Sequence, residues 1–393
     1  MPALATLFLG MFVMGSTELL IVGVLDLVAT DLRVSIPAAG TLVTAYALGL
    51  AIGGPLLTAL TIRFNKRTLL AAMLALFVVT TLITVLTSDY ALFLIARTAT
   101  GAFQGVFIAA AFAAGAAVVP PERMGRAIAV VISGVTVSGA LGVPLGTLAG
   151  QALGWRGSFT AAAVLAALAL VATLLLVPSV PSSGGGAGSQ VRHAFAPPVL
   201  AILALTVLVF ASVYAALTYI VPFLQTVTGV SGAAISVFLL AYGLATAVGS
   251  FGGGRFADAD AARTLVVASI GVAGCLLALL LGGSFAVLVA LALFGTGLFG
   301  MAMAPSMQYR VISLAGPGGA FAQSLPASAA NIGIASGSFA GGVALGAFDV
   351  SAAVVAALII AVAAIPVAWA TSFLKPAETA AERETTHGHH SPR

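Results

Sequence analysis

The sequence predicts an all-α polytopic membrane protein, and three observations support this fold class. Of the 393 residues, 61% are hydrophobic and only 7% are charged, against about 25% charged residues in a soluble domain. The apolar residues form twelve runs, each close to the roughly 20 residues that a helix needs to cross a membrane. The basic residues gather in alternate gaps between these runs, as they do in cytoplasmic loops.

The composition excludes several other classes of protein. With 15 Lys+Arg and 11 Asp+Glu, the chain cannot build the charged surface of a soluble enzyme, and it is too apolar to stay disordered. The net charge of +4 does not indicate a nucleic-acid partner, because the basic residues lie in short gaps between apolar runs. Cys275 is the single cysteine, which rules out an intrachain disulfide.

Each predicted span is apolar on every side, which favours a helix over a β-barrel strand of about ten alternating residues. The first run is longer than a signal peptide requires and lacks a basic start, so we expect it to be retained. The twelve predicted spans are 4–25, 37–60, 68–87, 90–112, 127–149, 157–178, 197–220, 232–253, 264–283, 285–307, 322–345 and 350–373.

The basic residues predict the orientation of the chain in the membrane. Twelve of the fifteen follow even-numbered spans or lie in the C-terminal tail. Arg33 and Arg156 lie in the opposite gaps, and Arg97 lies inside a span. Because cytoplasmic loops carry the excess of Lys and Arg, both termini are predicted to be cytoplasmic, which requires an even number of spans.

The middle of the chain predicts a division into two halves. Residues 181–189 read Pro-Ser-Ser-Gly-Gly-Gly-Ala-Gly-Ser, a composition typical of flexible linkers. Arg67-Thr-Leu recurs 196 residues later as Arg263-Thr-Leu, which favours an internal duplication. We therefore expect six-helix halves around a central cavity, with a cytoplasmic linker and tail; the predicted boundaries are 1–178, 179–196, 197–374 and 375–393.

Four segments carry specific motifs. They are Gly15-Ser-Thr-Glu18 in span 1, the loop from Gly54 to Arg67, Arg97-Thr-Ala-Thr-Gly-Ala-Phe-Gln104-Gly105 in span 4, and the Gly/Pro-rich stretch from Gly134 to Gly146 in span 5. Through them, residues 5–375 resemble the major facilitator superfamily, in its twelve-span drug:proton antiporter-like branch. The resemblance implies a bacterial exporter of drugs, of sugars such as arabinose, of chloramphenicol or of purine nucleosides.

The loop motif departs from the family pattern at two positions. The family usually carries Asp where this chain has Ile62, and Gly where it has Asn65. At the offset of 196, Asp258 falls opposite Ile62. We expect the acidic part of the cytoplasmic gate to lie at Asp258, near Arg255 and Arg263; alternatively, the first loop works through its cations alone.

Two charged residues inside spans are candidates for proton coupling. An ionised carboxylate near the bilayer centre costs about 2.5–3.5 kcal/mol, so Glu18 in span 1 is expected to face a cavity or a partner. The resemblance ties Arg97 to proton movement, and Glu18 is its expected partner: protonation of Glu18 would weaken the pair. The alternatives are a structural carboxyl group at Glu18 and helix bracing by Arg97.

Several polar and aromatic residues in spans are candidates for substrate binding. Each has a structural alternative, namely interhelical hydrogen bonding for the amides, interface anchoring for the tyrosines and core packing for the methionine. The candidates are Gln104, Tyr214, Tyr219, Gln225, Tyr242, Met303 and Asn331.

A third group of residues is expected to act in gating and conformational change. Small residues allow helices to approach closely, and a proline bends a helix. Basic loop residues supply the cytoplasmic gate that the resemblance implies. The expected residues are Gly54, Arg63, Lys66, Arg67, Gly139, Gly142, Pro144, Gly146, Asp258 and Arg263.

These features predict a proton-coupled exporter that works by alternating access. No Gly-Lys-Ser/Thr phosphate-binding motif is present, and His387, His389 and His390 fit a solvated tail better than a metal site, so no cofactor or metal is expected. The alternative is a facilitator or importer of a sugar or nucleoside, and a membrane enzyme or sensor is a third possibility. We expect a monomer in the cell membrane, with the lipid bilayer, a small molecule and protons as its partners.

Overall fold

The computed structural model describes residues 2–61, 63–120, 123–180, 195–315, 322 and 325–374. Within these ranges the regular secondary structure is entirely helical. Ten helices in this part of the chain are long and apolar enough to cross a membrane, which confirms the predicted all-α membrane class. Most of the predicted linker, the predicted tail 375–393 and Ile62 lie outside the described residues.

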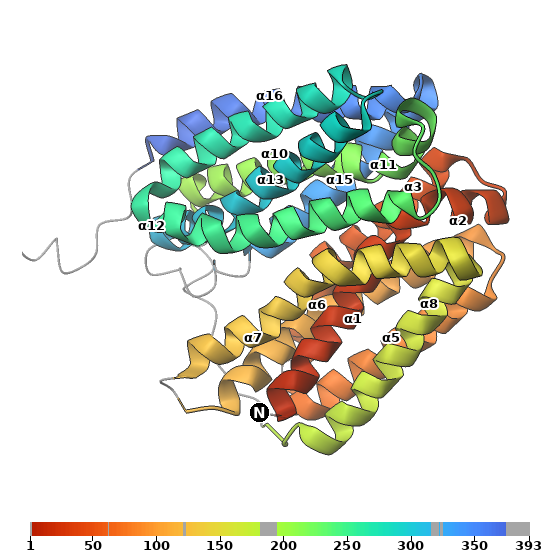
Figure 1. Cartoon of the computed structure of the whole chain (residues 1–393). Coiled ribbons are helices and arrows are strands. Elements are labelled where there is room, and N and C mark those ends of the chain that lie inside the picture. Colours follow the sequence, from red (N-terminus) through yellow and green to blue (C-terminus); the bar gives the residue numbers. More distant parts are fainter. Residues whose placement is uncertain are drawn as a thin grey trace, which may run out of the picture.

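The helices form two bundles that meet at one end of the molecule (Figure 1). The first bundle contains α1 (Pro2–Gly23), α2 (Leu25–Leu32), α3 (Ile36–Leu48), α4 (Gly54–Thr61), α5 (Lys66–Leu86), α6 (Tyr90–Ala117), α7 (Met124–Val137) and α8 (Val143–Leu176). The second contains α10 (Pro197–Leu217), α11 (Ile220–Phe223), α12 (Ala234–Leu281), α13 (Ala286–Ala315), α15 (Leu325–Ala347) and α16 (Val350–Ser372). π-helical turns connect α3 to α4 at Gly49–Gly53 (η1) and α7 to α8 at Ser138–Gly142 (η3), and a third one follows α11 at Leu224–Thr228 (η4).

Local sequence determines where several helices begin. A short polar side chain at the N-cap accepts a hydrogen bond from a free backbone N–H of the first turn. Ser35, Asn65, Asp89 and Asp349 do this for α3, α5, α6 and α16. These caps fix where the chain turns back between neighbouring helices.

The two longest helical stretches contain breaks. α12 has 48 residues and would be roughly 72 Å long at about 1.5 Å per residue, more than twice the thickness of the hydrocarbon core. Its path is interrupted at Asp260, which has extended backbone angles and whose Oδ1 accepts a hydrogen bond from the N–H of Arg263 at 2.9 Å. α8 is interrupted at Gly154, where φ is 77°, a conformation that glycine adopts without steric cost.

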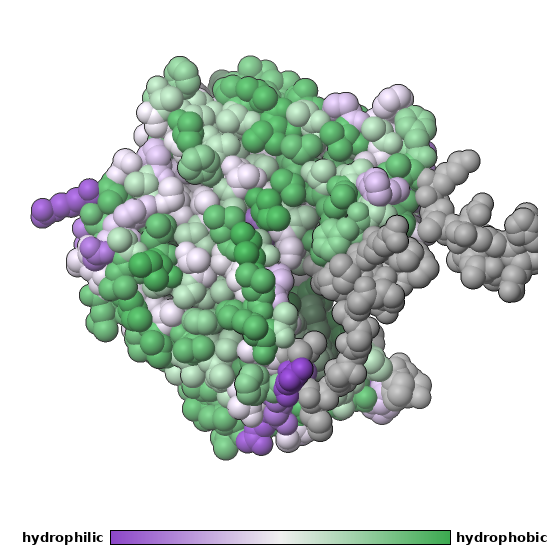
Figure 2. Space-filling view, turned by 180° about the vertical axis from the view of Figure 1, so that it is seen from behind, coloured by the Kyte–Doolittle hydropathy of each residue, from purple (hydrophilic) through white to green (hydrophobic). Residues whose placement is uncertain are grey.

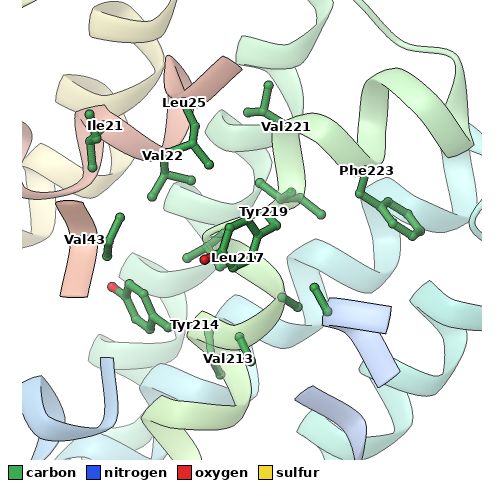
Figure 3. Packing of buried hydrophobic residues seen from close by; sticks show 14 of the residues in the cluster. Ile21, Val22, Leu25, Val43, Val213, Tyr214, Leu217, Tyr219, Val221 and Phe223 are labelled. Carbon is green, nitrogen blue, oxygen red and sulfur yellow. The ribbon is translucent and has the colours of Figure 1, made fainter. Parts of the chain in front are cut away.

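The buried core is shared by the two bundles at one end only. One buried cluster combines residues of the first bundle, such as Leu25 and Val43, with residues of the second, such as Leu217 and Phe223. Figure 3 shows part of this cluster around α10 and α11. Two further clusters each belong to a single bundle. The bundles are therefore packed together at the end formed by α2, α3 and α11, and they separate towards the end where residue 2 lies (Figure 1).

The lateral surface of the molecule is apolar. Large side chains along the helices, such as Leu168 of α8, Val248 of α12 and Ile359 of α16, are 57%, 56% and 64% exposed. Figure 2 shows hydrophobic residues over most of the visible side, with the strongly hydrophilic ones near its ends. Helices that are apolar all round suit a lipid environment, so this surface faces the bilayer.

One contact between the bundles brings backbone directly against backbone. A Cβ atom added at Gly243 of α12 would collide with the carbonyl oxygen of Gly139 in η3. Only glycine permits this approach, because any side chain would force the two segments apart. The close crossing of α12 and η3 thus depends on Gly243.

We predict that Gly243→Ala lowers the apparent unfolding temperature of the detergent-purified protein. Overpacking of this kind typically costs about 1–3 kcal/mol. The matched control is Gly274→Ala on the same helix, where an added Cβ would meet nothing within 4 Å and alanine is the better helix former. Equal unfolding temperatures for the two variants would contradict the tight crossing.

Candidate functional site

A cavity of about 280 Å³ lies between the two bundles. Its walls come from α1, η1, α6, α7, η3 and α8 of the first bundle and from α10, α12, α13 and α15 of the second. Most of the lining side chains are apolar; the charged and larger polar ones are Glu18, Gln104, Tyr214, Tyr242 and Asn331. An apolar cavity with a few convergent polar groups is the usual form of a small-molecule site.

Glu18 is half-buried on α1 and lines the cavity, as predicted from its position inside span 1. Its Oε2 atom accepts a hydrogen bond of 2.8 Å from Nε2 of Gln104 on α6. The carboxylate is therefore accessible from the cavity and is oriented by a neighbouring helix.

A chain of side chains leads from Glu18 into the first bundle. The Oε1 atom of Gln104 accepts a hydrogen bond from the hydroxyl of Tyr46, which is 1% exposed on α3. The guanidinium of Arg97 stacks over the Tyr46 ring, 4.1 Å from its centroid, a favourable cation–π geometry. Tyr46 was not among the predicted residues, because its role depends on the packing of α3 against α1 and α6.

The predicted ion pair between Glu18 and Arg97 is wrong in this structure. Arg97 is 1% exposed and does not line the cavity. Its guanidinium donates to three backbone carbonyls, those of Thr17 at 3.0 Å, Glu18 at 3.1 Å and Leu42 at 3.4 Å. Because these main-chain acceptors already surround the planar group, Arg97 contacts the backbone of Glu18 and forms no ion pair with its carboxylate, both residues being described.

Some of the other residues predicted to bind substrate line the cavity, and others do not. Tyr214, Tyr242 and Asn331 line the cavity with Gln104. Met303 does not line the cavity, because it is fully buried in the core of the second bundle. Met301 lines the cavity where Met303 was expected. Helical periodicity explains this difference, since residues two positions apart face different sides.

Tyr219 also lies outside the cavity, contrary to expectation. It is 1% exposed, between Gly40 of α3 and Gly342 of α15, and its hydroxyl donates to the carbonyl of Ser338 at 2.8 Å. Figure 3 shows its ring within the cluster that joins the bundles. Tyr219 therefore contributes to the closed end of the molecule.

Gln225 was predicted to bind substrate, but it connects the two bundles instead. Its Nε2 atom donates to Oδ2 of Asp26 at 2.7 Å, while Oδ1 of Asp26 is buried without a partner among the described residues. Thr44 adds a second hydrogen bond between the bundles, to the carbonyl of Ala335 at 3.3 Å. These bonds lie at the end where the core is continuous.

The predicted loop cations make contacts within their own bundle. Arg67 donates to the carbonyl of Leu174 near the end of α8, and the N–H of Lys66 donates to the carbonyl of Val180 at 3.0 Å. Arg63 is exposed. Two of the three cations thus lie beside the segment that leads into the predicted linker.

In the second bundle, the structure does not join Asp258 and Arg263. Both are exposed, and Asp258 forms no ion pair in the part of the chain that the structure describes. Asp260 contacts Arg263 instead, through the backbone hydrogen bond described above. Asp260 was not predicted as the acidic partner, because the offset of 196 aligned Asp258 with the first loop.

The predicted glycines and the proline lie at helix contacts. Gly54 packs against Gly105 of α6, and a Cβ at Gly142 or Gly146 would collide with Ser16 or Leu20 of α1. Gly139 provides the carbonyl that meets Gly243, and Pro144 is the second residue of α8, which begins after the π-helical turn η3. Such turns often occur where a helix changes direction at a functional site.

Comparison with known proteins identifies the family. Residues 7–321 match the model of the Major Facilitator Superfamily. The chain belongs to this superfamily. Its members are membrane transporters, so the chain is a transporter of small molecules in the cell membrane.

Curated relatives of this superfamily match most of the chain. The inner membrane transport protein YdhP of Escherichia coli O157:H7 is 33% identical over 347 residues, which cover 87% of this chain and 88% of the relative. The chloramphenicol resistance protein of Streptomyces lividans is 31% identical over 340 residues, covering 85% and 84%. The putative transporter AraJ of Escherichia coli K12 is 30% identical over 251 residues, 64% of each chain.

Two solved structures share the fold of this chain. A bacterial homologue of the human lysosomal transporter Spinster, crystallised in an inward-facing and unoccupied conformation, gives a TM-score of 0.78 at 17% identity, covering 94% of this chain and 96% of that one. A single-residue mutant of the nucleoside transporter NupG gives a TM-score of 0.76 at 13% identity, covering 95% and 99%.

We predict that Arg97→Lys lowers the apparent unfolding temperature of this superfamily member. An ammonium cannot reproduce the planar fork that reaches three carbonyls, and each hydrogen bond to a charged group contributes about 1.5–3 kcal/mol. The exposed Arg33 provides the matched control as Arg33→Lys, which should leave the temperature unchanged. If both variants unfold at the wild-type temperature, Arg97 does not hold α1 and α3 together.

Proposed function

We propose that the chain is a proton-coupled secondary active exporter of small organic molecules that works by alternating access. The observation that carries this proposal is the Glu18 carboxylate, which lines the central cavity and is oriented by Gln104. A carboxylate in an otherwise apolar cavity can bind and release a proton without a bound cofactor. One relative supports an export function, since it is named for chloramphenicol resistance, and another, named as an inner membrane transport protein, supports transport across a membrane.

The proposal includes twelve spans in two six-helix halves. The breaks at Gly154 and Asp260 divide two of the ten long helices, which supports twelve membrane crossings. With the excess of Lys and Arg on the side of the predicted linker and tail, the positive-inside rule places both termini in the cytoplasm. The protein would act as a monomer, because each chain provides both walls of the cavity.

The conformation supports alternating access with a closed outer side. The shared core cluster, the Asp26–Gln225 hydrogen bond and the packing of Tyr219 all lie at one end. With the termini in the cytoplasm, this end faces outwards, and the bundles separate on the cytoplasmic side. Export requires the outer contacts to break and inner contacts to form.

Proton coupling would pass through hydrogen bonds rather than through a direct ion pair. Protonation of Glu18 removes the negative charge to which Gln104 donates, and Gln104 is bonded in turn to Tyr46. Tyr46 supports the guanidinium of Arg97, which holds α1 and α3. A change at the carboxylate can therefore alter the packing of three helices in the first half.

We predict that Glu18→Gln abolishes proton antiport. Everted vesicles with an acidified interior and a pH-sensitive dye would receive chloramphenicol, arabinose and nucleosides in turn. A transported compound should collapse the pH gradient in wild-type vesicles and leave it intact in Glu18→Gln vesicles, because the amide cannot be protonated in this range. Asp349→Asn is the matched control, since it changes a carboxylate to an amide at a helix cap outside the cavity.

The other outcomes of this experiment are also informative. Equal collapse in both vesicle types would keep antiport and place the proton site elsewhere. If the pH gradient never responds while a panel member enters without any gradient, the protein is a facilitator of that solute and the exporter proposal is wrong.

We predict that Asp26→Ala and Gln225→Ala each increase the outward-open population. Removal of either partner breaks the same hydrogen bond between the halves, so the double variant should add little to either single variant. Spin labels at the exposed outer positions Ser88 and Ser231, in a Cys275→Ser background, would report the distance between the halves. Fully additive shifts would show that the two residues act independently.

A further inference from the structure

The formally charged side chains that line the cavity, among the described residues, are of negative sign only. Glu18 is the only residue with a formally charged side chain among the described residues that line it. Arg97 cannot pair with a ligand in the cavity, because it is 1% exposed, lies outside the cavity lining and donates to three backbone carbonyls. An anionic solute in this cavity would meet a carboxylate and an apolar wall without a cation to pair with, which is strongly unfavourable.

Most neutral hydrogen-bonding groups in the cavity are already occupied. Gln104 uses its amide nitrogen on Glu18 and its oxygen on Tyr46. Ser138 and Thr246 donate their hydroxyls to the carbonyls of Val135 and Gly243, each at 2.7 Å. The hydroxyls of Thr136, Tyr214 and Tyr242, which also line the cavity, can either donate or accept, so they do not discriminate between ligand types.

The exception is Asn331 on α15, which offers a free acceptor. Its Nδ2 atom donates to the carbonyl of Ala327 at 2.9 Å, and its Oδ1 atom is buried without a partner among the described residues. The amide orientation is fixed, because a backbone carbonyl can only accept. An unpaired buried acceptor is unfavourable, and a donor on a bound ligand would satisfy it.

We infer that the substrate is an apolar organic amine bound in its protonated form. The ammonium group binds at the Glu18 carboxylate, a further N–H or O–H donor is met by Oδ1 of Asn331, and the apolar body packs against side chains such as Val209, Phe210 and Leu239. The two acceptors belong to opposite halves, so such a ligand contacts both. This inference rests on the proposed transport function and narrows its substrate class.

The test compares three compounds with the same carbon skeleton and different charge. 4-Phenylbutylamine, 4-phenylbutanol and 4-phenylbutyrate would be titrated at neutral pH into the full-length protein in nanodiscs, with empty nanodiscs as background. Calorimetry should show the amine binding roughly ten- to a hundredfold more tightly than the alcohol, as expected for hydrogen bonds to a charged group. The butyrate should show no saturable binding.

Variants of Glu18 and Asn331 test which side chains cause the preference for the amine. Glu18→Gln should remove the preference for the amine over the alcohol, and Asn331→Leu should weaken amine binding several-fold. Asn331→Asp keeps the side-chain shape, adds a carboxylate and should tighten amine binding. Such a gain cannot result from misfolding, whereas a loss of binding in the leucine variant could. Asp349→Asn, outside the cavity, should bind all three compounds as the wild type does.

The inference is overturned if the butyrate or the alcohol binds as tightly as the amine, if the amine does not bind, or if Glu18→Gln retains the amine preference. Unchanged amine binding by both Asn331 variants would remove Asn331 from the site. The assay uses no pH gradient, so its outcome is separable from that of the vesicle experiment. Antiport of neutral compounds without amine preference would refute this inference alone, and amine preference without antiport would refute the proton coupling alone.

Discussion

The structure depends on the accommodation of charge inside an apolar bundle. Arg97 is almost fully buried, and an unsatisfied guanidinium at membrane depth would destabilise the fold by several kcal/mol. Its contacts with carbonyls of α1 and α3 and with the Tyr46 ring satisfy it, and they fix how three helices pack around one side of the cavity. Because backbone carbonyls and the Tyr46 ring satisfy Arg97, its guanidinium does not need the Glu18 carboxylate as a partner. The carboxylate can therefore face the cavity.

Burial of apolar surface explains why the bundles are packed at one end and separated at the other. At the end formed by α2, α3 and α11, apolar residues of both bundles form one cluster, so contact between them removes a large apolar surface from solvent. Towards the opposite end, each bundle has its own cluster, and little apolar surface is shared. The hydrogen bond from Gln225 to Asp26 supplements this packing, because it requires the two side chains to meet in one specific geometry.

Much of the fold follows from the sequence alone, because apolar runs of membrane length need only be counted. The depth of Glu18 and its exposure to a cavity follow from the same count. The partners of Arg97 and Gln225 do not, because they depend on which helices are neighbours and on rotations of a few tens of degrees. Met303 shows the limit clearly: it and Met301 have the same chemistry and differ by two positions, but only Met301 lines the cavity. The repeat offset misplaced the acidic loop residue for a similar reason, since a shift of two residues separates Asp258 from Asp260.

The cavity has an unequal division of polar groups between its two walls. In the described structure, the first half contributes the carboxylate and the residues that hold it, whereas the second half contributes neutral groups, Tyr214, Tyr242 and Asn331, on an apolar wall. Substitutions in the second half can therefore reshape the cavity while leaving the ionisable apparatus intact. Relatives within the superfamily could diversify their substrates through this wall during evolution, with the wall that holds the carboxylate inherited unchanged.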